Sequence, residues 1–494
     1  MPLELDVLLL LGAAVLLVAV IVAKMGERLG LPALLLFLFL GIAISAPSDF
    51  HLFDDAALAH DLGFAALVLI LADGGLSTKW RDIRPAIVPA ALLATVGVVI
   101  TVVVVALVGH YVLGLPWSVA VLIGAIMAPT DSAAVFSVLR SVPLPAPVRS
   151  TLEGESGLND APTVLLVVAM TEIARGTQSH GFLALGFIIA GELVGGILLG
   201  LGLGWLGVKI LRQLALPASG LYPLASLGWA VLAYGAGVAL HISGFAAVYV
   251  CSVVLSHGKL PHRHATRSFA SGLGWFAQIG LFIMLGLLAV PSRIGWSEVI
   301  QATVAGLALT FLARPLAVAV CLTPFKVPWR EQAFVSWAGL RGAVPIILAT
   351  VPLEWGIPRA DDIFDLTFVA VIVLTLLNAP SLPWVAKRLG LAGSTTEVDI
   401  EVAPLDRVEA DMLQIRVPAG SRLHGVSVAE LRLPPNTTVT LIIRDDQMVT
   451  PHGRDRIRTG DELLIVTPSE GRQTVEDRLR AVGRSGRLAG WTGE

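Results

Sequence analysis

The feature that most constrains this chain is a series of long apolar stretches that ends near residue 393. Each stretch is close to the ~20 residues that an α-helix needs to cross a bilayer. We count thirteen: 5–23, 31–46, 57–73, 86–109, 117–139, 151–173, 182–208, 220–240, 242–257, 270–290, 298–322, 332–352 and 363–386. Charged residues make up only 14% of the chain, whereas soluble proteins carry about 25%. The pattern predicts an all-α polytopic membrane protein.

The loops between these stretches alternate in positive charge. One set of loops holds sixteen Lys and Arg residues, and the alternate set holds only Arg175, Arg293 and Arg359. Loops rich in Lys and Arg stay on the cytoplasmic side of a membrane. We therefore expect the N-terminus outside and the C-terminus in the cytoplasm.

The composition changes after the last apolar stretch. Residues 1–390 form the expected membrane domain, and the polar segment 391–408 is expected to be a linker. Short alternating runs at 412–417, 437–444 and 462–466 predict half-buried strands, and 427–431 and 472–482 read as helices. We expect a small α+β cytoplasmic domain over 409–483, followed by a disordered tail at 484–494.

The fifth stretch carries an acid beside a helix breaker. Pro129 removes a backbone donor and disfavours helix at Ala128, so the helix is expected to open next to Thr130 and Asp131. Transporters place ion sites at such discontinuous helices. The alternative is a simple proline kink with Asp131 as a helix cap.

The sixth stretch has polar residues on one helix side. Glu155 and Asn159 are four residues apart, and so are Ser156 and Asp160, which makes two adjacent stripes. An ionisable residue inside a span is a functional candidate. Asp160 is the stronger one, because an apolar run follows it, while Glu155 alone could be interfacial.

The twelfth stretch contains Arg341 between small residues, ahead of Pro345. A buried arginine needs a carboxylate partner, and Glu155 is the best candidate. The fifth and twelfth stretches correspond if 1–6 and 8–13 are two inverted six-helix repeats with unwound crossing helices. Asp73 is expected to be a cap or interfacial residue, and the role of Arg314 stays open between a lipid headgroup contact and a core anchor.

Several other classes of function lack support in the sequence. Cys251 and Cys321 stand alone in apolar stretches, which argues against a disulfide or a metal site. No basic run suggests nucleic acid, and no phosphate-binding loop or aromatic cluster suggests an enzyme or an organic cofactor. A potassium channel would need a carbonyl filter of the Thr-Val-Gly-Tyr-Gly type, and the sequence has none.

Three motifs carry a family resemblance: Pro129–Asp131, Glu155–Asp160 and Gly339–Pro345. With them, residues 1–390 resemble bacterial sodium/proton and potassium/proton antiporters of the monovalent cation/proton antiporter superfamily. Residues 411–468 resemble the C-terminal subdomain of regulators of potassium conductance. The resemblance implies a homodimer in the bacterial inner membrane. It also implies a small-molecule regulator, such as cyclic di-AMP, at the C-terminal domain.

The resemblance also implies roles for the motif residues. Asp160 would alternately bind a monovalent cation and a proton, with Asp131, Thr130 and Ser156 completing the site. Glu155, Asn159 and Arg341 would organise it as a polar clamp. Hard cations favour such oxygen ligands, and desolvation lets protons compete for a buried carboxylate.

Asn159 bears on the stoichiometry. Family members that move net charge have aspartate at this position, whereas here Asp160 alone needs to exchange its charge. We therefore expect electroneutral exchange of potassium for protons, with sodium as the alternative cation. Potassium is favoured because the C-terminal subdomain resembles those attached to potassium systems.

Overall fold

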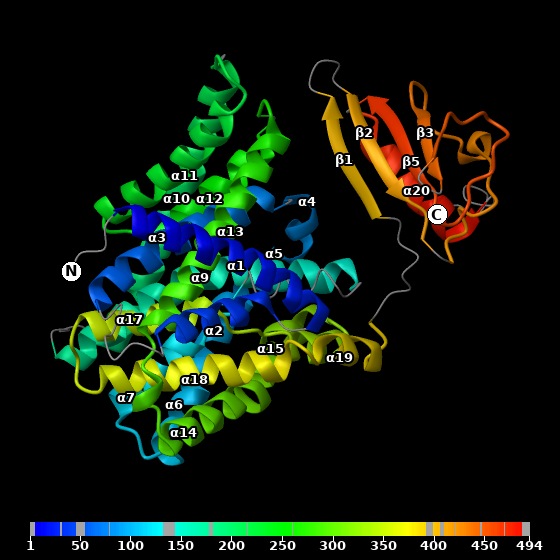
Figure 1. The fold of residues 1–494 in the computed structure, drawn as a ribbon. Coiled ribbons are helices and arrows are strands. Elements are labelled where there is room, and N and C mark those ends of the chain that lie inside the picture. Colours follow the sequence, from blue (N-terminus) through cyan, green and yellow to red (C-terminus); the bar gives the residue numbers. More distant parts are fainter. Residues whose placement is uncertain are drawn as a thin grey trace. The chain divides into compact units, whose positions relative to one another are not determined.

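The structure is a computed structural model of the 494-residue chain with two compact units, residues 1–392 and 393–494. It describes residues 5–29, 32–45, 55–78, 80–131, 144–176, 181–214, 216–258, 260–391, 399–405, 410–418, 420–444, 447–468 and 470–486. Figure 1 shows a helical first unit and a second unit built on a sheet. Each unit is described by itself.

The first unit consists of helices, most of them apolar. Its first half contains α1 (Leu5–Leu29), α2 (Ala33–Ser45), α3 (Ala56–Ser77), α4 (Trp80–Ile83), η1 (Arg84–Ala86), α5 (Ile87–Leu92), η2 (Leu93–Gly97), α6 (Val98–Tyr111), α7 (Trp117–Met127) and α9 (Ala146–Arg175). The remainder contains α10 (Phe182–Gln213), α11 (Leu221–Ala239), α12 (Gly244–His257), α13 (Arg263–Leu288), η3 (Pro291–Arg293), α14 (Trp296–Ala308), η4 (Leu309–Ala313), α15 (Arg314–Leu322), η5 (Thr323–Phe325), α16 (Trp329–Trp337), α17 (Ala343–Glu354), α18 (Ala360–Asn378) and α19 (Leu382–Arg388).

Every one of the thirteen expected stretches coincides with helix in the described part of the chain. By length and composition, eight described helices can cross a membrane, or nine if the bent pair α18–α19 is one span. Four more apolar helices, α2, α7, α12 and α17, are shorter than a full crossing. The structure therefore confirms a polytopic membrane protein but not the count of thirteen spans.

Breaks in the helices occur at corresponding places in the two halves. The fourth expected stretch contains the π-helical segment η2, and the eleventh contains the π-helical segment η4. The fifth stretch loses its helix after Met127, and the twelfth loses it between Trp337 and Ala343. Such π segments often mark functional sites inside helices. The paired breaks match the expectation of two related halves.

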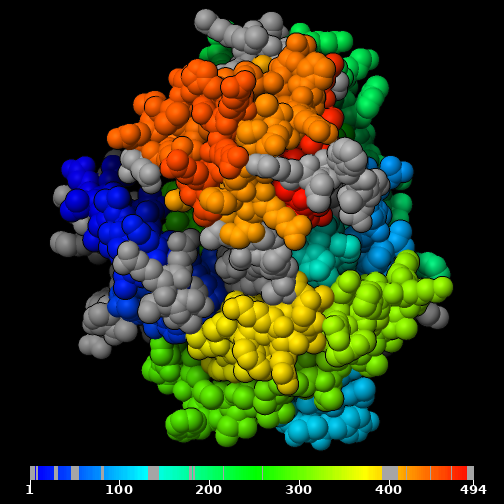
Figure 2. Space-filling view, turned by 90° about the vertical axis from the view of Figure 1, so that its right-hand side faces the viewer, coloured from blue at the N-terminus to red at the C-terminus, as the bar shows by residue number. Residues whose placement is uncertain are grey.

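The helices pack in two groups that meet at α9 and α17. Helices α2, α3 and α13 pack together, with α12 between α3 and α10, while α6 packs on α7 and α14 packs on α18. Figure 1 shows α9 and α17 lying between these groups, and both contact α3 as well as α7. In the space-filling view of Figure 2, α18 and α19 (yellow) form one surface with the yellow-green segments α14–α16.

The second unit is an antiparallel sheet with a helix. Its strands are β1 (Asp399–Leu405), β2 (Ala410–Arg416), β3 (Thr438–Arg444), β4 (Gln447–Val449) and β5 (Glu462–Pro468), in the order β1-β2-β5-β3-β4. The short helix η6 (Val428–Leu431) and α20 (Arg472–Ser485) complete it. Alternate residues of β2 and β5, such as Leu413 and Ile465, are fully buried in its core.

Three features of this unit differ from the sequence expectation. Strand β1 lies inside the segment expected to be a linker, and it pairs with β2 along its whole length. Strand β4 is only three residues long, too short to leave an alternating pattern. Helix α20 continues to Ser485, two residues into the expected tail, and residues 487–494 lie outside the described part.

Candidate functional site

Four polar side chains of α9 are buried in the middle of the membrane unit. Glu155, Ser156, Asn159 and Asp160 are each at most 2% exposed, on two adjacent turns of the helix. Pro162, one turn further on, cannot donate to the carbonyl of Leu158. The α9 motif therefore places carboxylates, a hydroxyl and an amide where water is excluded.

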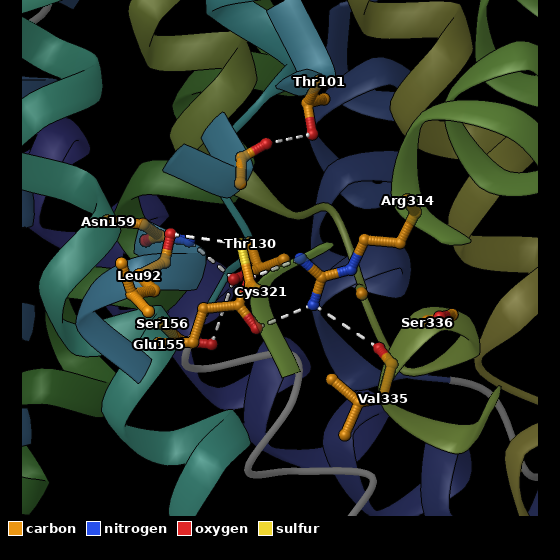
Figure 3. Close-up of polar contacts among 12 residues, drawn as sticks. Leu92, Thr101, Thr130, Glu155, Ser156, Asn159, Arg314, Cys321, Val335 and Ser336 are labelled. Carbon is orange, nitrogen blue, oxygen red and sulfur yellow. Dashed lines mark hydrogen bonds and ion pairs between the residues drawn. The ribbon is translucent and has the colours of Figure 1, made fainter. Parts of the chain in front are cut away.

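The end of α7 meets this polar face of α9. The backbone leaves the helix after Met127, as expected from Pro129, and brings Thr130 against α9. The Thr130 Oγ1 atom lies 3.2 Å from Ser156 Oγ, and Asn159 Nδ2 donates to Thr130 Oγ1 over 2.7 Å. Figure 3 shows the three side chains together. Two of the predicted cation ligands, Thr130 and Ser156, thus lie together, and Asn159, which was expected in a clamp with Glu155 and Arg341, bonds to Thr130.

The end of α7 and the start of α17, which flank the two helix breaks, cross and cap each other. The Asp131 backbone N–H donates to Leu340 O over 3.0 Å, and Asp131 Oδ2 accepts from the backbone N–H of Ala343 over 2.9 Å at the start of α17. Arg341 Nε donates to Met127 O over 2.8 Å at the end of α7. The Asp131 carboxylate therefore lies at the N-terminus of α17, and the Arg341 guanidinium lies at the C-terminus of α7. Helix dipoles favour this arrangement.

Gly342 makes this crossing possible. A Cβ atom at this position would collide with the Asp131 carboxylate. The absence of a side chain lets the acid approach the first backbone N–H groups of α17, which have no partner within the helix.

The expected ion pair between Glu155 and Arg341 is wrong, because Glu155 pairs with Arg314 instead. Arg314 Nη1 and Nη2 donate to the two Glu155 carboxylate oxygens, the second over 2.7 Å, and the side chains are 5% and 2% exposed. Figure 3 shows this fork. Arg341 instead donates to two main-chain carbonyls, those of Met127 and Gly339.

Arg314 is the site residue whose role the sequence left open. It begins α15 directly after the π segment η4, and Gly339 lies so close that a Cβ there would be 2.7 Å from Arg314 Nε. A charge in the middle of an apolar stretch, next to Pro315, was the available signal. Asp73, expected to be a cap or an interfacial residue, lies in the last turns of α3, where its Oδ1 accepts from Ser77 Oγ over 3.1 Å and Thr78 is the C-cap.

Asp160 differs from the other carboxylates of this cluster. Its Oδ1 atom is fully buried and has no hydrogen-bond partner among the residues that the structure describes, and the same holds for Asn159 Oδ1. Asp131 is its electrostatic neighbour. Burying a charged oxygen without a partner is costly. The arrangement suits a carboxylate whose partner is a mobile proton or cation.

Comparison with known proteins identifies the family. The model of the sodium/hydrogen exchanger transmembrane family matches residues 13–388, and that of the TrkA-C domain matches residues 412–480. The chain belongs to the sodium/hydrogen exchanger family. The expected family and the expected regulatory subdomain are thus confirmed.

Several exchanger relatives cover most of this chain. It is 36% identical to the K(+)/H(+) antiporter NhaP2 of Shewanella baltica, over 92% of this chain and 80% of the relative. It is 33% identical to the K(+)/H(+) antiporter NhaP of Alkalimonas amylolytica, over 91% and 79%. It is 29% identical to the Na(+)/H(+) antiporter NhaS2 of Synechocystis, over 76% and 70%.

A solved exchanger structure has the same membrane fold. The sodium proton antiporter MjNhaP1 from Methanocaldococcus jannaschii superposes with a TM-score of 0.66 at 25% identity. The match covers 78% of this chain and 99% of that protein. The fold of the membrane unit is therefore that of an exchanger.

Proposed function

We propose that this chain exchanges potassium for protons across the bacterial inner membrane, with Asp160 as the group that binds each in turn. One observation carries the proposal: the Asp160 carboxylate is buried, with an unpartnered oxygen, on the helix face that also presents Ser156. The hydroxyls of Thr130 and Ser156 supply the oxygen ligands that a hard monovalent cation favours. Potassium is favoured by the relatives named K(+)/H(+) antiporters.

The neighbours of Asp160 have fixed partners, and this supports a single exchanging group. Glu155 is held by Arg314, and Asp131 caps α17. Asn159 is neutral and donates its amide to Thr130. In this proposal only Asp160 changes its charge state, so one cation exchanges for one proton and no net charge moves.

The proposal includes an orientation and an assembly. The alternation of Lys and Arg among the loops favours an external N-terminus and a cytoplasmic C-terminal domain. The chain works as a homodimer, and a small molecule such as cyclic di-AMP acts through the TrkA-C domain. The presence of that domain supports regulation, since it is a separate compact unit outside the membrane helices.

Sodium/proton exchange is the second candidate function. It is favoured by the fold shared with the sodium proton antiporter MjNhaP1 and by the relative NhaS2. Both candidates use the same site, and they differ only in the cation that the oxygen ligands select.

A flux assay in proteoliposomes separates the candidates. Purified protein is reconstituted with a pH-sensitive dye inside, and potassium, sodium, rubidium and lithium are added in turn. We expect potassium to drive the fastest proton movement at the lowest half-saturating concentration. A response to sodium but not to potassium would replace the first candidate by the second.

The same vesicles test the stoichiometry. With no ion gradient, an imposed membrane potential of either sign should move no protons, because each cycle carries no net charge. Proton movement driven by voltage alone would show that a second group, such as Asp131, also exchanges its proton.

A further inference from the structure

Tyr249 of helix α12 touches α9 beside the proposed site. A Cβ atom built on Gly157 would meet the Tyr249 hydroxyl, with the ring atoms Cζ and Cε2 at 2.6 and 2.8 Å. Tyr249 is only 8% exposed. The ring tip therefore fills the space that the missing side chain of Gly157 leaves on α9.

This contact lies within one turn of the exchanging carboxylate. Gly157 follows Ser156 directly and precedes Asp160 by three residues, so its contact surface adjoins the site. The tyrosine tip thus lies at the edge of the site, toward the N-terminal end of α9.

Helix α12 packs closely on the end of α3 at the same level. A Cβ atom built on Gly75 of α3 would lie 2.8 Å from Tyr249 O and 2.5 Å from Ser252 Cβ. Tyr249 therefore contacts α3 through its backbone and α9 through its ring tip, from its place on α12.

Beyond Tyr249, the same side of α12 is polar up to its last turn. Ser252 is fully buried, and its hydroxyl has no partner among the described residues. Ser256 Oγ, one turn later, donates to Thr78 O over 3.1 Å. Residues 249, 252 and 256 share one helix face. Hydroxyl groups therefore lead from the Tyr249 ring to the His257 end of the helix.

We propose that Tyr249 is the gate that closes the Asp160 site toward the His257 end of α12. In this proposal its ring, which packs on Gly157, separates the site from the hydroxyls of Ser252 and Ser256. That the gate passes a monovalent cation rests on the proposed function. Opening requires the ring tip to leave α9, which exposes Asp160 to the polar face of α12.

The test measures access to the site rather than transport. In the full-length protein with Cys251→Ala and Cys321→Ala, the reporter Ser156→Cys is labelled with a cationic methanethiosulfonate. Adding Tyr249→Ala should raise the labelling rate by about tenfold, since that rate scales with the fraction of molecules whose site is open. Tyr249→Phe keeps the ring and should label within a few-fold of the parent.

Two further variants make the result specific. Tyr234→Ala removes another tyrosine ring, on α11, which packs on Phe245. This variant should leave the labelling rate unchanged. If Tyr249→Ala does not fold, Gly157→Ala replaces it, because the added methyl group displaces the ring tip and should raise labelling in the same way. Labelling at the parent rate in folded Tyr249→Ala or Gly157→Ala overturns the gate. Labelling does not need exchange, so it stays informative even if the protein transports nothing.

Discussion

At the scale of single residues, the membrane unit contains buried charges of two kinds. Glu155 and Arg314 hold each other through two hydrogen bonds and have nothing left to exchange. Asp160 has an unpartnered oxygen in the same cluster. Glu155, which is held by Arg314 of α15, and Asp160 both lie on α9. Under the proposed function, a structural role and the exchange role thus fall to different side chains of one helix.

The ion pair gives a prediction for stability. Glu155→Ala or Arg314→Ala alone leaves a buried charge unpaired, which costs about 3–5 kcal/mol. The double variant should lose clearly less than the sum of the two, with a coupling of about 0.5–3 kcal/mol. Thermal unfolding in detergent measures all three. The exposed pair Arg359 and Asp362 is the control, and its loss should change stability by about 1 kcal/mol or less. Additive losses at Glu155 and Arg314 would contradict the pairing.

The sequence revealed most of these residues but not their partners. Helical spacing placed Ser156, Asn159 and Asp160 on one side of α9, because neighbours along a helix are set by local geometry. Which arginine meets Glu155 depends on how helices 159 residues apart in sequence pack. A carboxylate partner was expected for Arg341 because a buried charge needs compensation, whereas the broken helix α7 offers it a free carbonyl.

At the scale of elements, the crossing of α7 and α17 holds the site together. Each break ends with a charged side chain that caps the helix of the other half, Asp131 on α17 and Arg341 on α7. The breaks themselves could be predicted, since Pro129 and the glycines around Arg341 disfavour helix. The mutual capping could not, because it needs the two halves to be brought together in space.

The crossing depends on the missing side chain of Gly342. In Gly342→Ala the added methyl group collides with the Asp131 carboxylate and breaks its bond to Ala343 N. We expect a loss of about 1–3 kcal/mol of stability, the cost of an unsatisfied buried group, together with slower cation-driven proton flux. Gly280→Ala on α13 is the matched control, because its methyl group meets nothing within 4 Å. Equal flux and equal melting temperatures in the two variants would contradict this role.

At the scale of the whole molecule, an exchanger unit is joined to a separate TrkA-C unit. The change in composition after residue 393 predicted two parts, and the structure divides the chain between residues 392 and 393. Strand β1 was missed because it lies in a stretch that reads as a polar linker, and its pairing with β2 is what makes it a strand. The sequence pattern thus located both units. It could not locate the edge strand β1, because that strand forms only by pairing with its neighbour β2.

Removing the second unit tests whether it regulates the first. A chain ending at Leu391 keeps the site residues and the described membrane helices. We expect it to exchange cations for protons in proteoliposomes, with a changed response to pH or to added cyclic di-AMP. A truncated protein that is well folded but inactive would show that the TrkA-C unit is part of the transport machinery.

The most direct test of the account is proton flux through Asp160→Asn in proteoliposomes. The amide has nearly the same size, but it neither releases a proton nor balances a cation, so cation-driven flux should fall to the level of empty vesicles. Glu192→Gln, which neutralises a half-buried acid on α10, is the matched control and should keep exchange. Both proteins should elute as the wild type does from a sizing column. Potassium-dependent proton movement through folded Asp160→Asn would contradict the assignment of the exchanging carboxylate.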